Sequence, residues 1–284
     1  MRAGISYFNA ARASSTIYQG DVNTLSAYKI THYRVWASWD KNGSSSRVVK
    51  TDGTLDATRT TTLKNFIAYV KSKGGTVDVT LGSGNTTNGF PSFSAHKTGV
   101  TNLVTTLRGV AGIWNIDVAN EYPVHYTDAQ AAELLQAARA ADGSRGGFTA
   151  SIDGDANSRI VPHYKGLISA LGSNWKNYLG LVAPHFGPRT SSLARNTLTN
   201  VKNVNSGLST YKPQVYLQEE GRWNNPNTSA QEYYDSFQGA RNGGAVLWIL
   251  HTAAGYDLTS KSLISQLNST EKTVLTYLGY NATP

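Results

Sequence analysis

The sequence has 284 residues, of which 39% are hydrophobic and 15% are charged, so a disordered chain is excluded and we expect one folded domain over residues 1–284. The 26 basic and 18 acidic residues give a net charge of +8, but they are scattered along the chain and form no basic run of the kind that binds nucleic acid. Cysteine is absent, which excludes disulfides and thiolate catalysis, and the best apolar run, Ala245 to Leu250, is far shorter than the roughly 20 residues of a membrane span.

Eight short apolar runs alternate with amphipathic stretches along the chain. The runs are bounded by Gly, Asn and Pro, a pattern typical of strands that helices connect into a parallel sheet. In chain order the predicted strands are Ala3 to Phe8, Ile30 to Trp36, Thr76 to Leu81, Ile113 to Ala119, Phe148 to Ile152, Leu179 to Ala183, Gln214 to Gln218 and Ala245 to Leu250.

Helices between these runs are indicated by spacing and by capping residues. One predicted helix has four apolar residues at helical spacing along a single face: Leu63, Phe66, Ile67 and Val70. Two further helices are predicted to begin at capping boxes, one made by Thr127 with Gln130 and one by Ser229 with Glu232.

Eight strands with intervening helices can close into a barrel or spread into a doubly wound sheet. The strand count favours a (β/α)8 barrel. A dinucleotide-binding sheet would need a third glycine after Gly82-Ser83-Gly84-Asn85, and none follows at the required position. We therefore predict a single (β/α)8-barrel catalytic domain over residues 1–284.

Carboxylates follow two of the predicted strands where the active face of such a barrel lies. The fourth strand runs out at Asn120-Glu121, and the seventh at Glu219-Glu220-Gly221. Cleavage of a glycosidic bond needs one carboxylic acid to protonate the leaving oxygen and one carboxylate to attack or stabilise the sugar. Glu121 with either Glu219 or Glu220 supplies that pair.

These two motifs resemble those of the clan A glycoside hydrolases, with family 5 cellulases and mannanases as the nearest analogy. The resemblance implies a retaining mechanism, with Glu121 as acid/base and Asn120 bonding the sugar 2-hydroxyl. The clan's seventh-strand pattern is Glu-x-Gly, which selects Glu219 over Glu220 as the nucleophile. The function implied is hydrolysis of a β-glycan, by an endo-glycanase such as a glucanase or mannanase.

Other positions extend the resemblance along the chain. Arg34 resembles the second-strand arginine that supports the nucleophile, His185 the sixth-strand histidine, and Trp248 the eighth-strand tryptophan that forms a sugar platform. Two departures point to a divergent family of the same clan: the position of the usual tyrosine after the histidine holds Gly187, and the third strand lacks its usual histidine.

Aromatic residues at predicted strand ends are candidates for stacking on a pyranose. The tryptophans in this position, with Trp248, are Trp36, Trp39 and Trp223. For His251, a packing role and a pocket-lining role are equally compatible with the sequence.

A metal-dependent hydrolase has to be weighed, because Asp153-Gly154-Asp155 follows the fifth strand. Catalytic zinc usually takes three protein ligands, and no His-x-His motif occurs on a strand, so we expect neither metal nor cofactor. The sequence is also compatible with a catalytically idle carbohydrate-binding barrel and with an exo-acting β-glycosidase. The strand that begins almost at once, without a signal peptide, predicts a mature secreted protein, and we expect a monomer.

Overall fold

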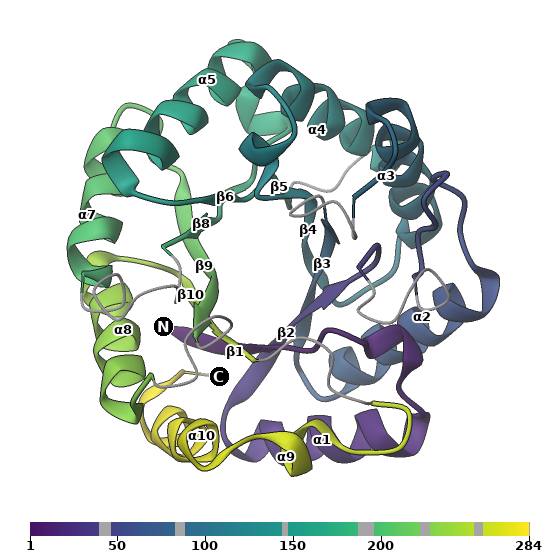
Figure 1. Ribbon diagram of the computed structural model, residues 1–284, viewed down its shortest axis with the longest axis vertical. Coiled ribbons are helices and arrows are strands. Elements are labelled where there is room, and N and C mark those ends of the chain that lie inside the picture. The colour runs from purple at the N-terminus through teal and green to yellow at the C-terminus, as the bar shows by residue number, and fades with distance from the viewer. Residues whose placement is uncertain are drawn as a thin grey trace.

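The computed structural model describes residues 1–39, 47–82, 89–143, 147–186, 196–221, 228–252 and 258–283. Its strands form a ring that a layer of helices surrounds on the outside (Figure 1). The predicted (β/α)8 barrel is confirmed. No helix in these ranges combines the length and the apolar character that crossing a membrane requires.

The barrel wall is a parallel sheet in the order β5-β4-β3-β2-β1-β10-β9-β7, and β6 pairs with β8. The strands are β1 (Arg2–Ser6), β2 (Ile30–Trp36), β3 (Thr76–Gly82), β4 (Ile113–Asn120), β5 (Phe148–Thr149), β6 (Ile152–Asp153), β7 (Leu181–Val182), β8 (Pro184–His185), β9 (Gln214–Gly221) and β10 (Leu247–His251). The wall closes between β5 and β7, where the Gly180 N–H donates to the Phe148 carbonyl and the Thr149 hydroxyl donates to the Leu181 carbonyl.

The predicted fifth strand is divided into β5 and β6, and the predicted sixth strand contains β7, with β8 just beyond its predicted end at Ala183. The Ser151 N–H, between β5 and β6, donates to the Asp117 side chain at 3.1 Å. The Ala183 N–H, between β7 and β8, donates to the Tyr164 hydroxyl at 2.7 Å. Side chains take these backbone donors in place of a neighbouring strand, so each ladder is interrupted for a residue or two.

The helices of the outer layer are α1 (Ser15–Ala27), α2 (Ala57–Ser72), α3 (Phe93–Leu107), α4 (Asp128–Asp142), α5 (Val161–Leu171), α7 (Thr197–Gly207), α8 (Ala230–Gly243), α9 (Leu263–Gln266) and α10 (Ser269–Asn281). Both predicted capping boxes are present, at the starts of α4 and α8. The apolar face predicted on α2 is fully buried. Most of the hydrophobic core therefore lies between the strands and the helices.

Inside the barrel, the part farther from the carboxyl ends of the strands, which we call the lower part, is filled by a separate apolar cluster: Leu181, Ala183, Tyr216, Leu247 and Ile249. Above this cluster, buried polar side chains replace apolar ones, including Arg34, Asp78 and Asp117. Buried charges at this level need partners, and they provide the floor of the site described next.

Candidate active site

The carboxyl ends of β2, β4, β8 and β9 bring together the residues that the sequence singles out. Arg34 lies on β2, Asn120 ends β4, Glu121 follows it, His185 ends β8 and Glu219 lies on β9. Their side chains converge at one end of the barrel, as expected for the active face of this fold.

Glu121 is placed by an irregular end of β4. Thr80 and Gly82 of β3 pair with Asp117 and Asn120 of β4, so three steps along β4 match two along β3, which is a β-bulge. Glu121 itself has φ 52°, in the left-handed region that costs a non-glycine residue of order 1 kcal/mol. Bulge and turn together aim both Asn120 and Glu121 at the barrel mouth.

The backbone on both sides of this turn is held in place. The Glu121 N–H donates to the Ser151 hydroxyl at 3.0 Å, and the Tyr122 N–H donates to the Ser151 carbonyl at 3.1 Å. Tyr122 is fully buried, and its hydroxyl donates to Asp128 of α4 at 3.0 Å. These bonds offset the cost of the left-handed conformation at Glu121.

A second bulge places Glu219. Leu217 and Glu220 of β9 pair with Trp248 and Leu250 of β10, so β9 carries one extra residue here. Glu219 therefore faces the barrel interior, while Glu220 faces α8 and accepts a hydrogen bond from Ser236.

Arg34 is fully buried and ties the two motifs together. Its Nη1 donates to Glu219 Oε1 at 2.5 Å, and its Nη2 donates to Asn120 Oδ1 at 2.6 Å. Its Nε donates to Thr80 Oγ1 at 3.0 Å, and Asp117 lies 3.5 Å from Nη2. One guanidinium thus fixes the rotamers of both Asn120 and Glu219.

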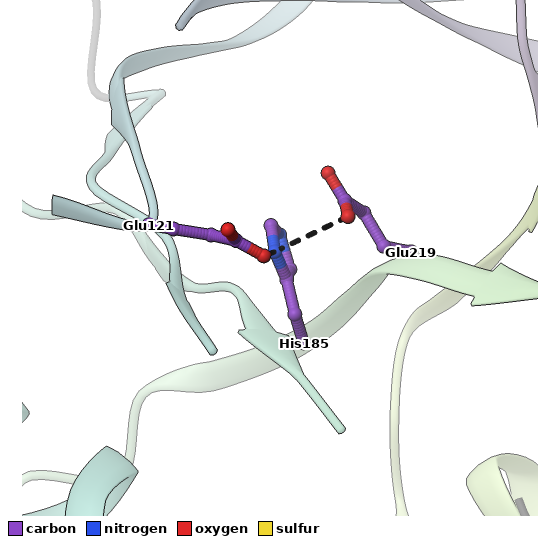
Figure 2. Close-up of side chains that lie close together, drawn as sticks. All are labelled: Glu121, His185 and Glu219. Atoms are coloured by element: carbon purple, nitrogen blue, oxygen red, sulfur yellow. Dashed lines mark hydrogen bonds and ion pairs between the residues drawn. The ribbon is translucent and has the colours of Figure 1, made fainter. Parts of the chain in front are cut away.

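His185 lies between the two carboxylates (Figure 2). Its Nδ1 is 3.1 Å from Glu121 Oε1 and 3.6 Å from Glu219 Oε2. One oxygen of each glutamate and one His185 nitrogen all lie within 4.8 Å of one another. The carboxylates of the two motifs, far apart in sequence, are therefore close together in space.

The charges around Glu219 favour its ionised form. Burial acts to raise the pKa of Glu219, but the positive charges of His185 and Arg34 hold that pKa well below its ordinary range. Burial likewise acts to lower the pKa of His185, yet the Glu219 charge and the bond to Glu121 raise this pKa to about 9. His185 is thus an imidazolium at neutral pH, and Glu219 a carboxylate.

His251, on β10, lies on the other side of Glu219, with Nε2 3.9 Å from Glu219 Oε2 and Nδ1 3.0 Å from the Ser6 hydroxyl. Burial lowers the pKa of His251 to about 4, so its ring is neutral at pH 7. It therefore lines the site next to the nucleophile candidate without adding charge at pH 7, whereas in acid its positive charge contributes to the lowered pKa of Glu219.

The structure corrects the expectation for Trp248. Its side chain is fully buried on the outer face of β10, where the indole N–H donates to Ser236 of α8 at 3.1 Å and the ring contacts Phe237. Trp248 therefore packs in the layer between sheet and helices and cannot serve as a sugar platform at the mouth.

Trp36 does lie at the site, but the residue is only 7% exposed. Phe8 stacks on the ring with 4.0 Å between centroids, and the Arg34 guanidinium carbon is 4.2 Å from its centroid. Trp36 thus supports Arg34 and offers little open ring surface. Trp39 is partly buried against Phe8, and Trp223 and Gly187 lie outside the described residues.

The cluster of Glu121, His185 and Glu219 is compact enough to raise the question of a metal ion. Both His185 nitrogens are already engaged, Nδ1 with Glu121 and Nε2 with Gln218 Oε1 at 3.1 Å. Arg34 also places a positive charge directly on Glu219, which disfavours a second cation there. The residues fit an acid–base cluster better than a metal site, and the absence of a metal stays a prediction.

Sequence reasoning missed the polar residues beneath the site. Asp78 accepts hydrogen bonds from the Tyr216 hydroxyl at 2.7 Å and the Gln218 amide at 2.6 Å, and Asp117 accepts from the Ser151 N–H. A usable signal existed, because each aspartate is flanked on both sides by β-branched apolar residues within a predicted strand. A buried charge within a strand indicates a partner across the barrel.

No protein-family model matches the sequence, and no curated protein matches it closely enough to count as a relative. Solved structures with similar folds are found, and three of them are 12%, 13% and 15% identical in sequence to this chain. A hyperthermostable endo-1,4-beta-D-mannanase from Thermotoga petrophila has a TM-score of 0.73 at 13% identity, with 99% of each chain covered.

Two further structures show the same likeness. GH5_18 from Streptomyces cattleya, in complex with GlcNAc, has a TM-score of 0.69 at 15% identity, with 100% of this chain and 81% of that chain covered. The endoglucanase Cel5A from Pseudomonas stutzeri has a TM-score of 0.66 at 12% identity, with 100% and 94% covered. At these identities the likeness establishes a shared fold.

Proposed function

We propose that the protein is a retaining glycoside hydrolase that cleaves a β-glycan through a covalent glycosyl-enzyme intermediate. The observation that carries the proposal is the approach of Glu121 and Glu219, of which one oxygen each lies within 4.8 Å of the other. Retaining enzymes hold their carboxyl groups roughly 5–5.5 Å apart, whereas inverting enzymes leave roughly 6.5–9.5 Å for a water molecule.

The environments of the two glutamates support different roles. Glu219 faces Arg34 and an imidazolium, which keep it ionised and suit a nucleophile. Glu121, on the opposite side, lies 3.1 Å from His185 Nδ1 and can receive the proton of that nitrogen, so it suits the residue that protonates the leaving oxygen and then takes a proton from water. Asn120, its amide oxygen held by Arg34 and Ser151, would orient the sugar 2-hydroxyl.

The substrate class rests on the structures with the same fold, which include an endo-1,4-beta-D-mannanase and an endoglucanase. We infer an endo-acting enzyme on a β-linked polysaccharide. A panel of β-glucan, mannan, xylan and galactan, each with and without chelator, identifies the glycan. Sugar binding without product from any of them would favour an idle, lectin-like barrel, and loss of activity with chelator would favour a metal enzyme.

Replacement of the nucleophile is the direct test. Glu219→Gln is expected to lower kcat by several orders of magnitude, because the neutral amide cannot form the glycosyl ester. A 2-deoxy-2-fluoro glycoside with a good leaving group should label Glu219, as peptide mass spectrometry would show. The matched control is Glu133→Gln on the surface of α4, which should leave both activity and labelling unchanged.

The stereochemistry of the product gives an independent check. Proton NMR of the first product formed should show the β anomer, since two displacements restore the configuration. An α product, or near-normal turnover by the Glu219→Gln protein, would overturn the proposal.

A further inference from the structure

We propose that Gln218 is a positioning residue that keeps a hydrogen on Nε2 of His185, so that only Nδ1, the nitrogen facing Glu121 and Glu219, gains and loses a proton. This inference rests on the proposed function, in which these two glutamates act on the sugar. It concerns a residue without direct access to the substrate, and it follows from hydrogen-bond directions inside the barrel.

Strand alternation puts Gln218 inside the barrel, and the bulge in β9 brings Glu219 in beside it. Tyr216 faces the interior, and regular alternation would put Gln218 inside and Glu219 outside. The extra residue between Leu217 and Glu220 allows Gln218 and Glu219 to face the interior in succession. Gln218 is fully buried directly beneath the nucleophile candidate.

Asp78 determines which way the Gln218 amide points. Its Oδ2 accepts from Gln218 Nε2 at 2.6 Å and from the Tyr216 hydroxyl at 2.7 Å, and its Oδ1 accepts from Asn115 at 3.0 Å. Arg34 Nε is 4.0 Å from the same carboxylate. A flipped Gln218 amide would set its oxygen against a carboxylate oxygen, so the observed orientation is strongly favoured.

The amide oxygen of Gln218 is then fixed against His185 Nε2, at 3.1 Å. An oxygen can only accept there, so Nε2 has to carry a hydrogen. Nδ1 is left as the nitrogen that titrates, 3.1 Å from Glu121 and 3.6 Å from Glu219.

This arrangement has a chemical use. When Nδ1 carries a proton, it donates to the carboxylates, and when it does not, its lone pair accepts from a protonated Glu121. The opposite neutral tautomer, with hydrogen on Nδ1 alone, could not accept the Glu121 proton. Gln218 thus keeps His185 able to hold Glu121 in position in both of its protonation states.

Other groups near His185 also bear on its titration. They come from four strands: Arg34 on β2, Asp117 on β4, Glu219 and Glu220 on β9, and His251 on β10. Asp153, the register neighbour of His185 on β6, forms an ion pair with Arg159 at 2.8 Å. Glu121 completes the set. Within the described part of the chain, the partner of Nε2 is Gln218, so a change at Gln218 acts on that nitrogen specifically.

The test combines two variants with nitrogen NMR of the substrate-free protein. Gln218→Met keeps the side-chain length but offers no acceptor, so the Nε2 signal of His185 should lose its protonated shift in the neutral form. Gln218→Glu can share a proton with Asp78 and still accept from Nε2, so it should retain the protonated signal. Gln238→Met, which removes a bond from α8 to Tyr277, is the matched control.

Kinetics provide the second measurement. Gln218→Met should lower kcat by roughly 10–100-fold, the usual cost of losing a partner that orients an active-site group. The basic limb of its pH profile of kcat should move to lower pH, because the His185 imidazolium loses the acceptor of its Nε2 hydrogen. Gln218→Glu should stay within about tenfold of the original rate, with the limb little changed. If Gln218 had a purely structural role, kcat would fall by similar factors in Gln218→Met and Gln218→Glu, and the basic limb of the pH profile would not move.

The outcomes separate this inference from the proposed function. Unchanged His185 signals in Gln218→Met, or a native protein in which Nε2 rather than Nδ1 titrates, would overturn the role of Gln218 even if Glu219 is labelled. A protein that cleaves no glycoside would overturn the proposed function, while the NMR comparison would still decide the tautomer. If Gln218→Met does not fold, titration of the native protein decides the question.

Discussion

Glu219 and Glu220 are adjacent in sequence but occupy different environments on the two faces of β9. Glu219 meets the positive charges of Arg34 and His185. Glu220 faces α8, where Ser236 donates to one of its oxygens and the other oxygen has no hydrogen-bond partner among the described residues. Burial raises the pKa of Glu220 to about 7, in contrast with the lowered pKa of Glu219.

The raised pKa of Glu220 predicts a pH-dependent cost to stability. The folded state binds this proton more tightly than the unfolded state, so stability is lost as pH rises from about 4.5 through about 7. Glu220→Gln should therefore raise the free energy of unfolding at pH 8, by about 3 kcal/mol at most, and change it little at pH 4. Denaturant titrations at both pH values measure this difference.

The control for that measurement is Glu133→Gln, whose side chain is half exposed and paired with Lys97. It should show almost no difference between the two pH values, because exposed pairs contribute little. Equal effects of Glu220→Gln at pH 4 and pH 8 would contradict the argument.

At the scale of elements, two bulged strands and one left-handed residue do most to build the site. β4 and β9 each carry one extra residue near their carboxyl ends, which turns the polar side chains of Asn120 and Glu219 inward. α4 begins soon after Glu121, and its first turn supplies Asp128, which accepts a hydrogen bond from the Tyr122 hydroxyl. The start of this helix therefore contributes to the placement of the acid candidate.

The capping box of α4 offers a prediction at this scale. Thr127→Ala removes the side-chain oxygen that accepts from the Gln130 N–H, and should lower the free energy of unfolding by about 1 kcal/mol. Thermal unfolding checks this, with Thr101→Ala in the exposed part of α3 as a control expected to be near neutral. An equal loss in both variants would show that capping is not the cause.

The sequence predicted elements better than it predicted side-chain directions. Alternation of apolar runs and amphipathic stretches was enough for the barrel, since each pattern is local. The inward turn of both Gln218 and Glu219 depends on register with β10, which no single strand encodes. Trp248 was assigned wrongly for a related reason: its position at a strand end was clear, but its face of the strand was not.

The whole molecule gathers several groups with altered pKa values in one layer of the barrel. Burial raises the pKa of Asp117 to about 6, whereas neighbouring carboxylates overcome burial and raise that of His185 to about 9. The stability from His185 is complete below about pH 6.5 and is lost as pH rises through about 9, and the costs from Asp117 and Glu220 also grow with pH. Glu219 acts oppositely, but only below about pH 4.5.

The sum of these contributions predicts that the thermal midpoint falls by several degrees between pH 5 and pH 9, at about 2–4 °C for each kcal/mol. Calorimetry at intervals of one pH unit measures the trend. Glu220→Gln should make the fall in the thermal midpoint less steep up to about pH 7, where Glu220 titrates. A midpoint that rises over this range would show that other groups dominate the linkage.

Arg34 makes contacts that reach three other strands: Asp78 on β3, Asp117 and Asn120 on β4, and Glu219 on β9. In evolution, a substitution at one of these positions therefore affects which substitutions are tolerated at the others. Replacement of the arginine would leave two buried aspartates and the nucleophile candidate without their shared cation. A substitution at one of these positions alone would therefore be destabilising. Among descendants of this sequence, these five sites should change in concert or not at all.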